Sequence, residues 1–270
     1  LVKGKRQVAA GFVELEVPVV ENLNVNLAGR YDHYDDFGSA WSPKVAFHYV
    51  LGDDWLLRGS WSRGFRAPSL PEIAESNTIS YGSVIDPTDP IIPGASRGFT
   101  QVRTGNSELD AERSTNLNAG IIWSPQKGAS IAVDVFEIEQ DDIIAPDNAQ
   151  FIINNEDQYA DRIQRDDAER LQIISNQYRN QGTRSTRGFD VDANYQVQLS
   201  NSTLQFQSTW SRLLEYEQAL VAGQDPIDGA GGNILGALPK WKGNNQLRWL
   251  VSDWQWGVSL NYTSSYEQQV

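Results

Sequence analysis

Residues 60–72 read SWSRGFRAPSLPE, and at this stretch a regular strand ends and a long loop begins. The first six side chains alternate between two sides of an extended chain, so that Trp61, Arg63 and Phe65 share one side. Pro68 and Pro71 then lack the N–H groups that a strand or helix needs, and each disfavours helix at the residue before it. The chain must therefore turn out of a sheet at this point.

The same two-residue alternation of apolar and polar side chains returns along the whole chain, so the sequence predicts an all-β fold. Turn signals such as Gly52-Asp53-Asp54 and Ser200-Asn201-Ser202 separate successive segments. We count ten predicted strands, within residues 13–19, 23–31, 44–51, 55–65, 115–123, 131–135, 189–199, 203–211, 247–251 and 254–262.

The predicted connections are short at one end of the sheet and long at the other. Short turns are expected near residues 18–21, 52–54, 124–128, 200–202 and 252–253, and long strandless loops at 67–111, 141–184 and 217–237. Outer-membrane barrels have short periplasmic turns and long extracellular loops. Aromatic residues also gather near both ends of the predicted strands, as the two interfacial girdles of such a barrel require.

A soluble antiparallel sandwich with one solvated face would alternate too. Its strands usually run about five or six residues, which is roughly half the length of the segment at 189–199. We therefore predict an antiparallel transmembrane β-barrel. Val191 and Tyr195 are expected to face lipid, and Asp190, Asp192 and Asn194 to face the lumen.

The composition argues against several other classes of protein. The 270 residues include 22 basic and 35 acidic side chains, a net charge of −13, whereas nucleic-acid binding needs clustered Lys and Arg. The absence of Cys excludes a disulfide framework and a thiolate metal site within this sequence. No apolar run is long enough to predict a transmembrane helix, and no signal segment opens the sequence.

A set of short motifs, in a fixed order and at characteristic separations, carries a family likeness. The motifs are Arg30-Tyr31-Asp32 with Phe37-Gly38, Ser42-Pro43-Lys44, Gly64-Phe65-Arg66-Ala67-Pro68-Ser69-Leu70-Pro71-Glu72, Asn106-Ser107-Glu108-Leu109 with Glu112-Arg113-Ser114, Gly188-Phe189-Asp190, and Leu238-Pro239-Lys240-Trp241. On these motifs nearly the whole chain resembles the barrel of TonB-dependent outer-membrane receptors.

The resemblance implies a barrel of about 22 strands with a plugged lumen. Residues 1–270 would then be a part of that barrel, without the amino-terminal plug and without the C-terminal strands, and Val270 follows a strand directly. We expect free sheet edges near 8–17 and 254–266, and we expect the isolated chain to need detergent. The implied partners are outer-membrane lipid and lipopolysaccharide, the energy-coupling protein TonB acting through the missing plug, and an extracellular small-molecule ligand. Nucleic acid is not an expected partner.

The function that the resemblance implies is active, TonB-coupled uptake of a scarce solute such as a siderophore, vitamin, carbohydrate or peptide in a Gram-negative outer membrane. A passive porin-like channel is the alternative. In the resemblance, extracellular loops catch the ligand, and aromatic and guanidinium side chains suit that task because they stack and donate hydrogen bonds. The candidate ligand-binding residues are Tyr81, Arg97, Phe99, Arg103, Phe151 and Tyr178.

No enzyme site is predicted, because no nucleophile, base and orienting group stand in a recognisable pattern. We predict no catalytic residue, cofactor or metal site, since charges at strand ends are usually solvated. Two acidic groups were weighed as metal ligands, namely Asp32, Asp35 and Asp36 beside His33, and Glu137, Glu139, Asp141 and Asp142. The Gly-rich stretch at 229–233 lacks the Lys of a phosphate loop and predicts a loop tip. The charged stretch at 156–170 fits a short surface helix or an irregular loop.

Overall fold

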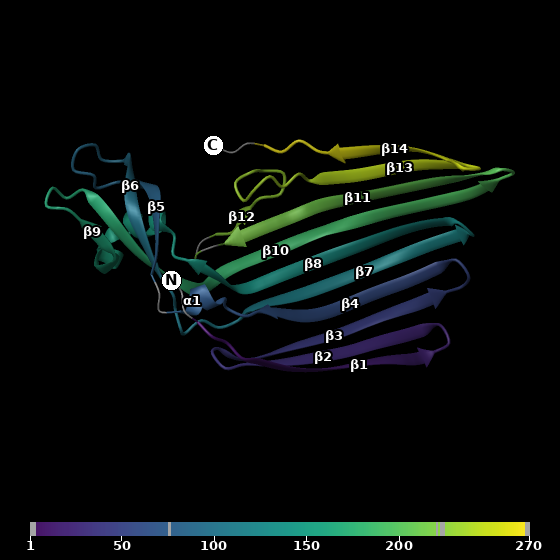
Figure 1. The fold of residues 1–270 in the computed structure, drawn as a ribbon, viewed down its shortest axis with the longest axis horizontal. Helices are drawn as coiled ribbons and strands as arrows, with labels where there is room; N and C mark the ends of the chain where they lie inside the picture. The colour runs from purple at the N-terminus through teal and green to yellow at the C-terminus, as the bar shows by residue number, and fades with distance from the viewer. Residues whose placement is uncertain (1–3, 75–76, 220, 222–224, 268–270) are drawn as a thin grey trace.

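The computed structural model describes residues 4–74, 77–219, 221 and 225–267. Its main feature is one antiparallel sheet, here called the wall, whose strands follow one another in chain order (Figure 1). The ten strands of the wall confirm the number that the alternation predicts. They are β1 (Val8–Val20), β2 (Leu23–Tyr34), β3 (Gly38–Leu51), β4 (Trp55–Arg66), β7 (Glu112–Gln126), β8 (Ala129–Pro146), β10 (Leu171–Leu199), β11 (Ser202–Ala219), β13 (Trp241–Val251) and β14 (Trp254–Thr263).

The wall is open along its two sides. Among the described residues, β1 pairs only with β2 and β14 pairs only with β13, so these two strands are the edges of the sheet. Both positions agree with the edges expected from the sequence. Two to three residues connect the strands at one end, for example Gly52 to Asp54 between β3 and β4.

The two faces of the wall differ in polarity, as predicted. On the inner face, Arg58 donates to Asp134 at 2.8 Å across the sheet, and Thr209 donates to Asp192 at 2.8 Å. On the outer face, apolar side chains lie side by side, and the rings of Trp55 and Trp123 stack with centroids 5.7 Å apart. Residues opposite one another in a register share a face, so each face keeps its character from strand to strand.

The long connections are not strandless, and that prediction was wrong. They contain α1 (Leu70–Ile73), β5 (Asn77–Asp86), β6 (Ala95–Thr104), α2 (Ala149–Asn154), α3 (Glu156–Tyr159), η1 (Ala160–Arg162), β9 (Ile163–Arg165) and β12 (Ile227–Asp228). The hairpin β5–β6 escaped notice because Ser, Thr and Gly occupy many of its positions, which weakens the apolar signal. The helix considered for the charged stretch at 156–170 exists as α3, four residues long. In the part of the chain that is described, no helix has the length and hydropathy to cross a bilayer.

Strand β10 links the wall to the loops. It runs without interruption over 29 residues, and its first part leaves the wall and pairs with β6 in parallel, from Ile173 opposite Thr100 to Gln177 opposite Thr104. The register with β8 shifts between Asn180 and Arg184, where β10 passes from the loops into the wall. These shifts are β-bulges, which bend a strand and increase its twist.

Candidate functional site

The loop elements at one end of the wall form a compact unit, here called the loop body. It consists of β5, β6, α2, α3, η1, β9 and residues 171–180 of β10. In Figure 1 it lies beyond the end of the wall opposite to the short turns, with β5 and β6 running across the direction of the wall strands. Two connections that are far apart in sequence, 67–111 and 147–182, thus meet in one structure.

The loop body has an apolar core of its own. Val84 of β5, Phe99 of β6, Ile152 and Ile153 of α2, and Leu171 and Ile174 of β10 are buried together. In the wall, by contrast, the large apolar side chains stand exposed on the outer face. Burial of such side chains stabilises by about 1.5–3 kcal/mol each, so this core helps to hold the elements of the loop body together.

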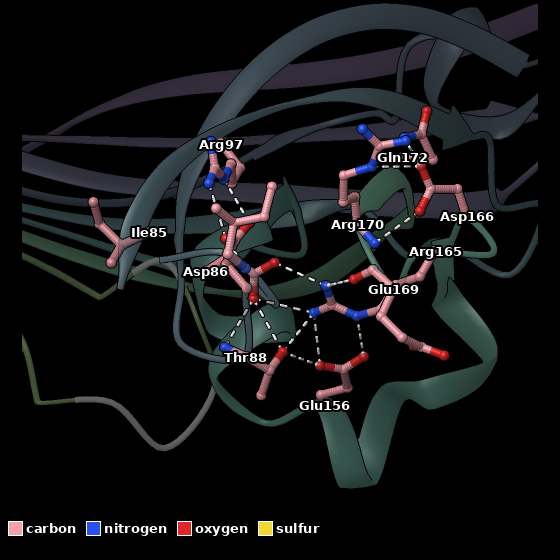
Figure 2. A network of polar contacts seen from close by, with 12 residues as sticks. Ile85, Asp86, Thr88, Arg97, Glu156, Arg165, Asp166, Glu169, Arg170 and Gln172 are labelled. Carbon is pink, nitrogen blue, oxygen red and sulfur yellow. Dashed lines mark hydrogen bonds and ion pairs between the residues drawn. The ribbon is translucent and has the colours of Figure 1, made fainter. Parts of the chain in front are cut away.

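One guanidinium joins the two connections. Arg165 of β9 donates to Asp86 at the end of β5, at 2.8 and 3.1 Å, and to both oxygens of Glu156 in α3, at 2.9 Å each (Figure 2). It also donates to the hydroxyl of Thr88 at 2.7 Å. The side chain of Asp86 is fully buried and that of Arg165 is only 11% exposed. We call these four residues the latch.

The latch carries its charges at neutral pH. The hydrogen bonds from Arg165 hold the pKa of Asp86 and the pKa of Glu156 below their usual ranges, against the opposing effect of burial. The same contacts raise the pKa of Arg165. The latch is therefore a fully ionised group of two carboxylates and one cation.

A second ion pair shapes the turn between β5 and β6. Asp89 accepts from Arg97 at 2.5 and 2.8 Å and from the backbone N–H groups of Ile91 and Ile92 at 2.9 and 2.7 Å. These bonds lower the pKa of Asp89, and the hydrogen bond from Arg97 has the largest effect. Arg97, named above as a candidate for ligand binding, is thus engaged in holding its own hairpin.

Three of the candidate residues stand where a ligand could reach them. Tyr81 lies on the face of β5 that points away from the core and is 86% exposed. Arg103 of β6 lies with its guanidinium 5.4 Å from the ring centre of Tyr178 in β10. The parallel pairing of β6 with β10 brings these last two residues together, although 75 positions separate them in the sequence.

The other two candidates serve the interior of the loop body. Phe99 is 6% exposed and belongs to the apolar core. Phe151 packs edge-to-face on Tyr159, with ring centres 5.9 Å apart. Phe99 is thus covered by the core and Phe151 is half-buried, whereas Tyr81 is the most exposed of the six candidates.

The acidic groups that were weighed as metal ligands are dispersed into separate contacts. Asp32 pairs with Arg30 at 2.7 Å, Asp36 pairs with Arg6 at 2.7 Å, and Glu137 pairs with Arg187. Among the residues that the structure describes, no three His, Asp or Glu side chains converge as a metal site would require.

The latch was not predicted. The sequence offered two hints, the turn-forming run Asp86-Pro87-Thr88-Asp89-Pro90 and the charge-rich stretch at 156–170. Neither hint says that the two segments meet, because their contact depends on the non-local pairing of β6 with β10.

Comparison with known proteins agrees with this architecture. The model of the family described as "TonB dependent receptor-like, beta-barrel" matches residues 2–270. The chain is 31% identical over 127 residues to the iron-regulated outer membrane virulence protein of Vibrio cholerae, covering 47% of this chain and 17% of that protein. It is 29% identical over 117 residues to the ferrienterobactin receptor of Escherichia coli, covering 43% of this chain and 15% of that protein. The matched segments span about a sixth of the length of these relatives.

Solved structures show the same fold. A ferric enterobactin receptor (PfeA) from Pseudomonas aeruginosa superposes with a TM-score of 0.69 at 17% identity, over 96% of this chain and 32% of that one. The siderophore receptor PirA from Acinetobacter baumannii superposes with a TM-score of 0.63 at 16% identity, over 97% of this chain and 34% of that one. The open wall of ten strands, each with one polar and one apolar face, agrees with a family match over almost the full length. The chain therefore belongs to the TonB-dependent receptor-like β-barrel family.

Proposed function

We propose that this chain forms part of the wall and extracellular loops of an outer-membrane receptor that takes up a ferric siderophore with energy supplied through TonB. The observation that carries the proposal is the family match over residues 2–270. Relatives named as receptors for ferric enterobactin support the choice of an iron chelate over a vitamin, sugar or peptide.

The geometry of the loop body supports capture of such a ligand. Its apolar core helps to hold its elements together, which reduces the cost of ordering a flexible segment on binding, a cost that lowers affinity in disordered binders. Arg103 stacked on Tyr178 offers a cation and an aromatic face together, and the exposed ring of Tyr81 offers a second face. An iron chelate with anionic and aromatic groups matches these surfaces.

A passive porin-like channel is the second class of function. A porin needs an open constriction lined by charge, and it does not need a folded body beyond its wall. The relatives described above are named as receptors and not as porins. We therefore place the receptor first.

The proposed partners follow from the two faces of the wall. Outer-membrane lipid and lipopolysaccharide would contact the apolar outer face. A plug domain, through which TonB acts in this family, would lie against the polar inner face, where a hollow of about 560 Å³ near the short turns is lined by residues such as Gln205, Gln246 and Arg248. The outer membrane of a Gram-negative cell is the proposed location.

Binding of ferric enterobactin to the full-length receptor in detergent tests the ligand. We expect quenching of tryptophan fluorescence to saturate, and we expect Tyr81→Ala and Arg103→Ala each to weaken binding about fivefold, since a stacking or cation–π contact contributes about 1 kcal/mol. Arg170→Ala is the matched control, because Arg170 lies in the loop body but pairs only with Asp166 on its surface. Absence of saturable binding in the wild type would refute the siderophore assignment.

Uptake into cells tests the coupling. We expect accumulation of radioactive iron to stop when an uncoupler removes the proton-motive force. Accumulation that continues unchanged, in proportion to the external concentration, would favour the porin-like channel.

A further inference from the structure

Strands β3 and β4 separate at the loop end of the wall. Their ladder ends where Lys44 lies opposite Ser62. Beyond that point β3 stays paired with β2 as far as Gly38, and β4 stays paired with β7 as far as Arg66. In Figure 1 the ribbons of β3 and β4 move apart toward the loop end of the wall. Pro43 contributes to the split, because it has no N–H with which to continue the ladder.

A cleft of about 480 Å³ occupies the split. Its walls include aromatic rings, hydroxyl groups and two guanidinium groups. Its lining includes Trp41, Arg63, Phe65, Asp110, Arg113 and Asp141. We call it the wall cleft.

The wall cleft is closed at both ends. The pair Lys44 and Ser62 closes it toward the middle of the wall. At the loop end, Arg6 donates to Asp36 in the β2–β3 turn at 2.7 Å and to the carbonyl of Pro68 after β4 at 2.6 Å. The cleft is therefore a bounded opening, and the separation of the strands is built into the fold.

Trp41, Arg63 and Arg113 belong to the outer face of the wall. Arg63 lies opposite Thr115 and Arg113 lies opposite Phe65, in the same alternation that places Trp61 opposite Leu117 on that face. Trp41 lies flat across Gly29, where a Cβ would stand 2.7 Å from the ring. The cleft thus opens to the side that carries the apolar band, near the loop end, where lipid head groups meet a barrel.

Both guanidinium groups are available for an anion. Within the described part of the chain, neither Arg63 nor Arg113 has a carboxylate oxygen within the 4.0 Å of an ion pair. The guanidinium of Arg63 lies over the ring of Trp61, whose centre is 5.6 Å away. An Arg near an anionic lipid surface contributes about 1 kcal/mol to membrane attraction.

Two carboxylates also line the wall cleft and have to be weighed. Asp141 belongs to β8, opposite Arg113 of β7, and lies two strands from β4, which is about 10 Å across a sheet. Asp110 precedes β7. Arg63 is on the strand that borders the split, so its guanidinium stands nearer to the split than Asp141 does, while Arg113 lies one strand away, between the two.

We propose that the wall cleft binds the phosphate-bearing head group of an anionic membrane lipid, with Arg63 and Arg113 donating to the phosphate and Trp41 and Phe65 packing against its apolar part. Guanidinium groups match phosphate oxygens in geometry and charge. The backbone N–H groups left unpaired along the split add further donors. The proposal rests on the membrane-barrel fold and is independent of the solute that the receptor transports.

Native mass spectrometry of the full-length receptor in detergent, titrated with phosphatidylglycerol, tests the proposal. We expect the wild type to retain one more lipid than the double variant Arg63→Gln/Arg113→Gln, with an affinity about tenfold or more higher. The double variant Arg63→Lys/Arg113→Lys should keep part of that affinity. Arg212→Gln is the matched control, because Arg212 also lies on the outer face, over the ring of Trp241, but belongs to β11, four strands from β4 and outside the wall cleft.

The remaining outcomes decide the chemistry of the occupant. Asp141→Asn should leave phosphatidylglycerol binding unchanged or strengthen it, whereas weaker binding would indicate a zwitterionic head group and overturn the proposal. Displacement of the lipid by an equal concentration of inorganic phosphate would show that the site takes phosphate alone. Equal lipid binding by the wild type and the Gln double variant, or an equal loss in Arg212→Gln, would also overturn it.

Discussion

Arg165 shows how one side chain can join two distant segments. Its planar guanidinium presents donors along two edges, and here one edge meets Asp86 and the other meets Glu156. A Lys could not replace this geometry, because an ammonium group is a point charge without a fixed fork. The hairpin β5–β6 and the connection 147–182 are therefore bound to one another by a residue that contacts neither the wall nor the candidates for ligand binding.

Arg165→Ala should loosen the loop body. It would leave the buried carboxylate of Asp86 without a cation, and we expect the free energy that stabilises the loop body to fall by about 3 kcal/mol. This value is at the low end for breaking a buried ion pair, because Glu156 can still reach water. Amide hydrogen exchange of the full-length receptor, followed at Val84 and Ile174, measures the loss. Arg170→Ala removes an exposed pair and should cost less than about 1 kcal/mol. Equal protection in the two variants would contradict a special role for the latch.

Acid should have the same effect as the mutation. Asp86 and Glu156 have pKa values that are lowered in the folded protein, so they contribute stability that is complete above their unfolded values, about 3.9 and 4.3, and is lost as the pH falls through the folded values. Protection of residues 147–172 from amide hydrogen exchange, relative to the intrinsic exchange rate at each pH, should hold from pH 7 to pH 5 and decline below about pH 4. In Arg165→Ala the loss of protection on acidification should be much smaller. An unchanged loss in this variant would show that carboxylates other than Asp86 and Glu156 cause it.

At the scale of single elements, β10 alternates polar side chains on the inner face of the wall with apolar side chains on the outer face. Asp190 and Asp192 accept hydrogen bonds from Ser211 and Thr209 on the inner face, while Val191 and Tyr195 belong to the outer face. A change of side chain should therefore have opposite consequences at neighbouring positions.

Ala193→Arg should destabilise the membrane-inserted receptor by about 2–4 kcal/mol, because position 193 alternates with the outer face near the middle of the wall. Asn194→Arg is the matched control on the inner face, where it borders a polar hollow, and it should cost much less. Urea titration of the full-length receptor in phospholipid vesicles compares the two. A spin-label scan over 189–199 should show accessibility to lipid with a period of two residues, and a flat profile would contradict the assignment of faces.

The elements differ in how far the sequence could predict them. The strands of the wall, such as β10 and β11, follow from alternation, because each residue reports its own face and the next strand is joined by a short turn. The parallel pairing of β6 with β10 does not follow, since nothing local in Arg103 or Tyr178 says that they meet. The burial of Phe99 does not follow from the sequence for the same reason: an aromatic residue in a connection gives the same local pattern whether it faces solvent or a core.

The whole molecule combines an open wall with a closed loop body. The wall needs neighbours on both edges and a nonpolar medium on one face, whereas the loop body buries its own apolar side chains. The described part of β14 illustrates the difference, with Trp254, Val258 and Leu260 each more than 65% exposed.

The chain of 270 residues by itself should aggregate in plain buffer. Its outer face presents apolar side chains from β1 to β14 as one continuous surface, larger than the few hundred Å² that soluble monomers expose. Each edge also offers a row of unpaired backbone groups. Size-exclusion chromatography with light scattering, with and without detergent, checks this. A sharp monomer peak without detergent, together with β-sheet circular dichroism, would contradict both the lipid-facing assignment and the open edges.

The continuity of β10 also bears on how such a receptor can change in length over evolution. Residues 147–170 pass through short helices and turns, so insertions in the turns that lie between the core and latch residues can bulge outward and leave the rest in place. Residues 171–182 belong to the same strand as the wall, and each residue added there would push the loop body about 3.3 Å along the strand and exchange its two faces. Descendants of this protein can therefore vary the turns of the first half between its core and latch residues, while the second half has to keep its length or change by compensating bulges.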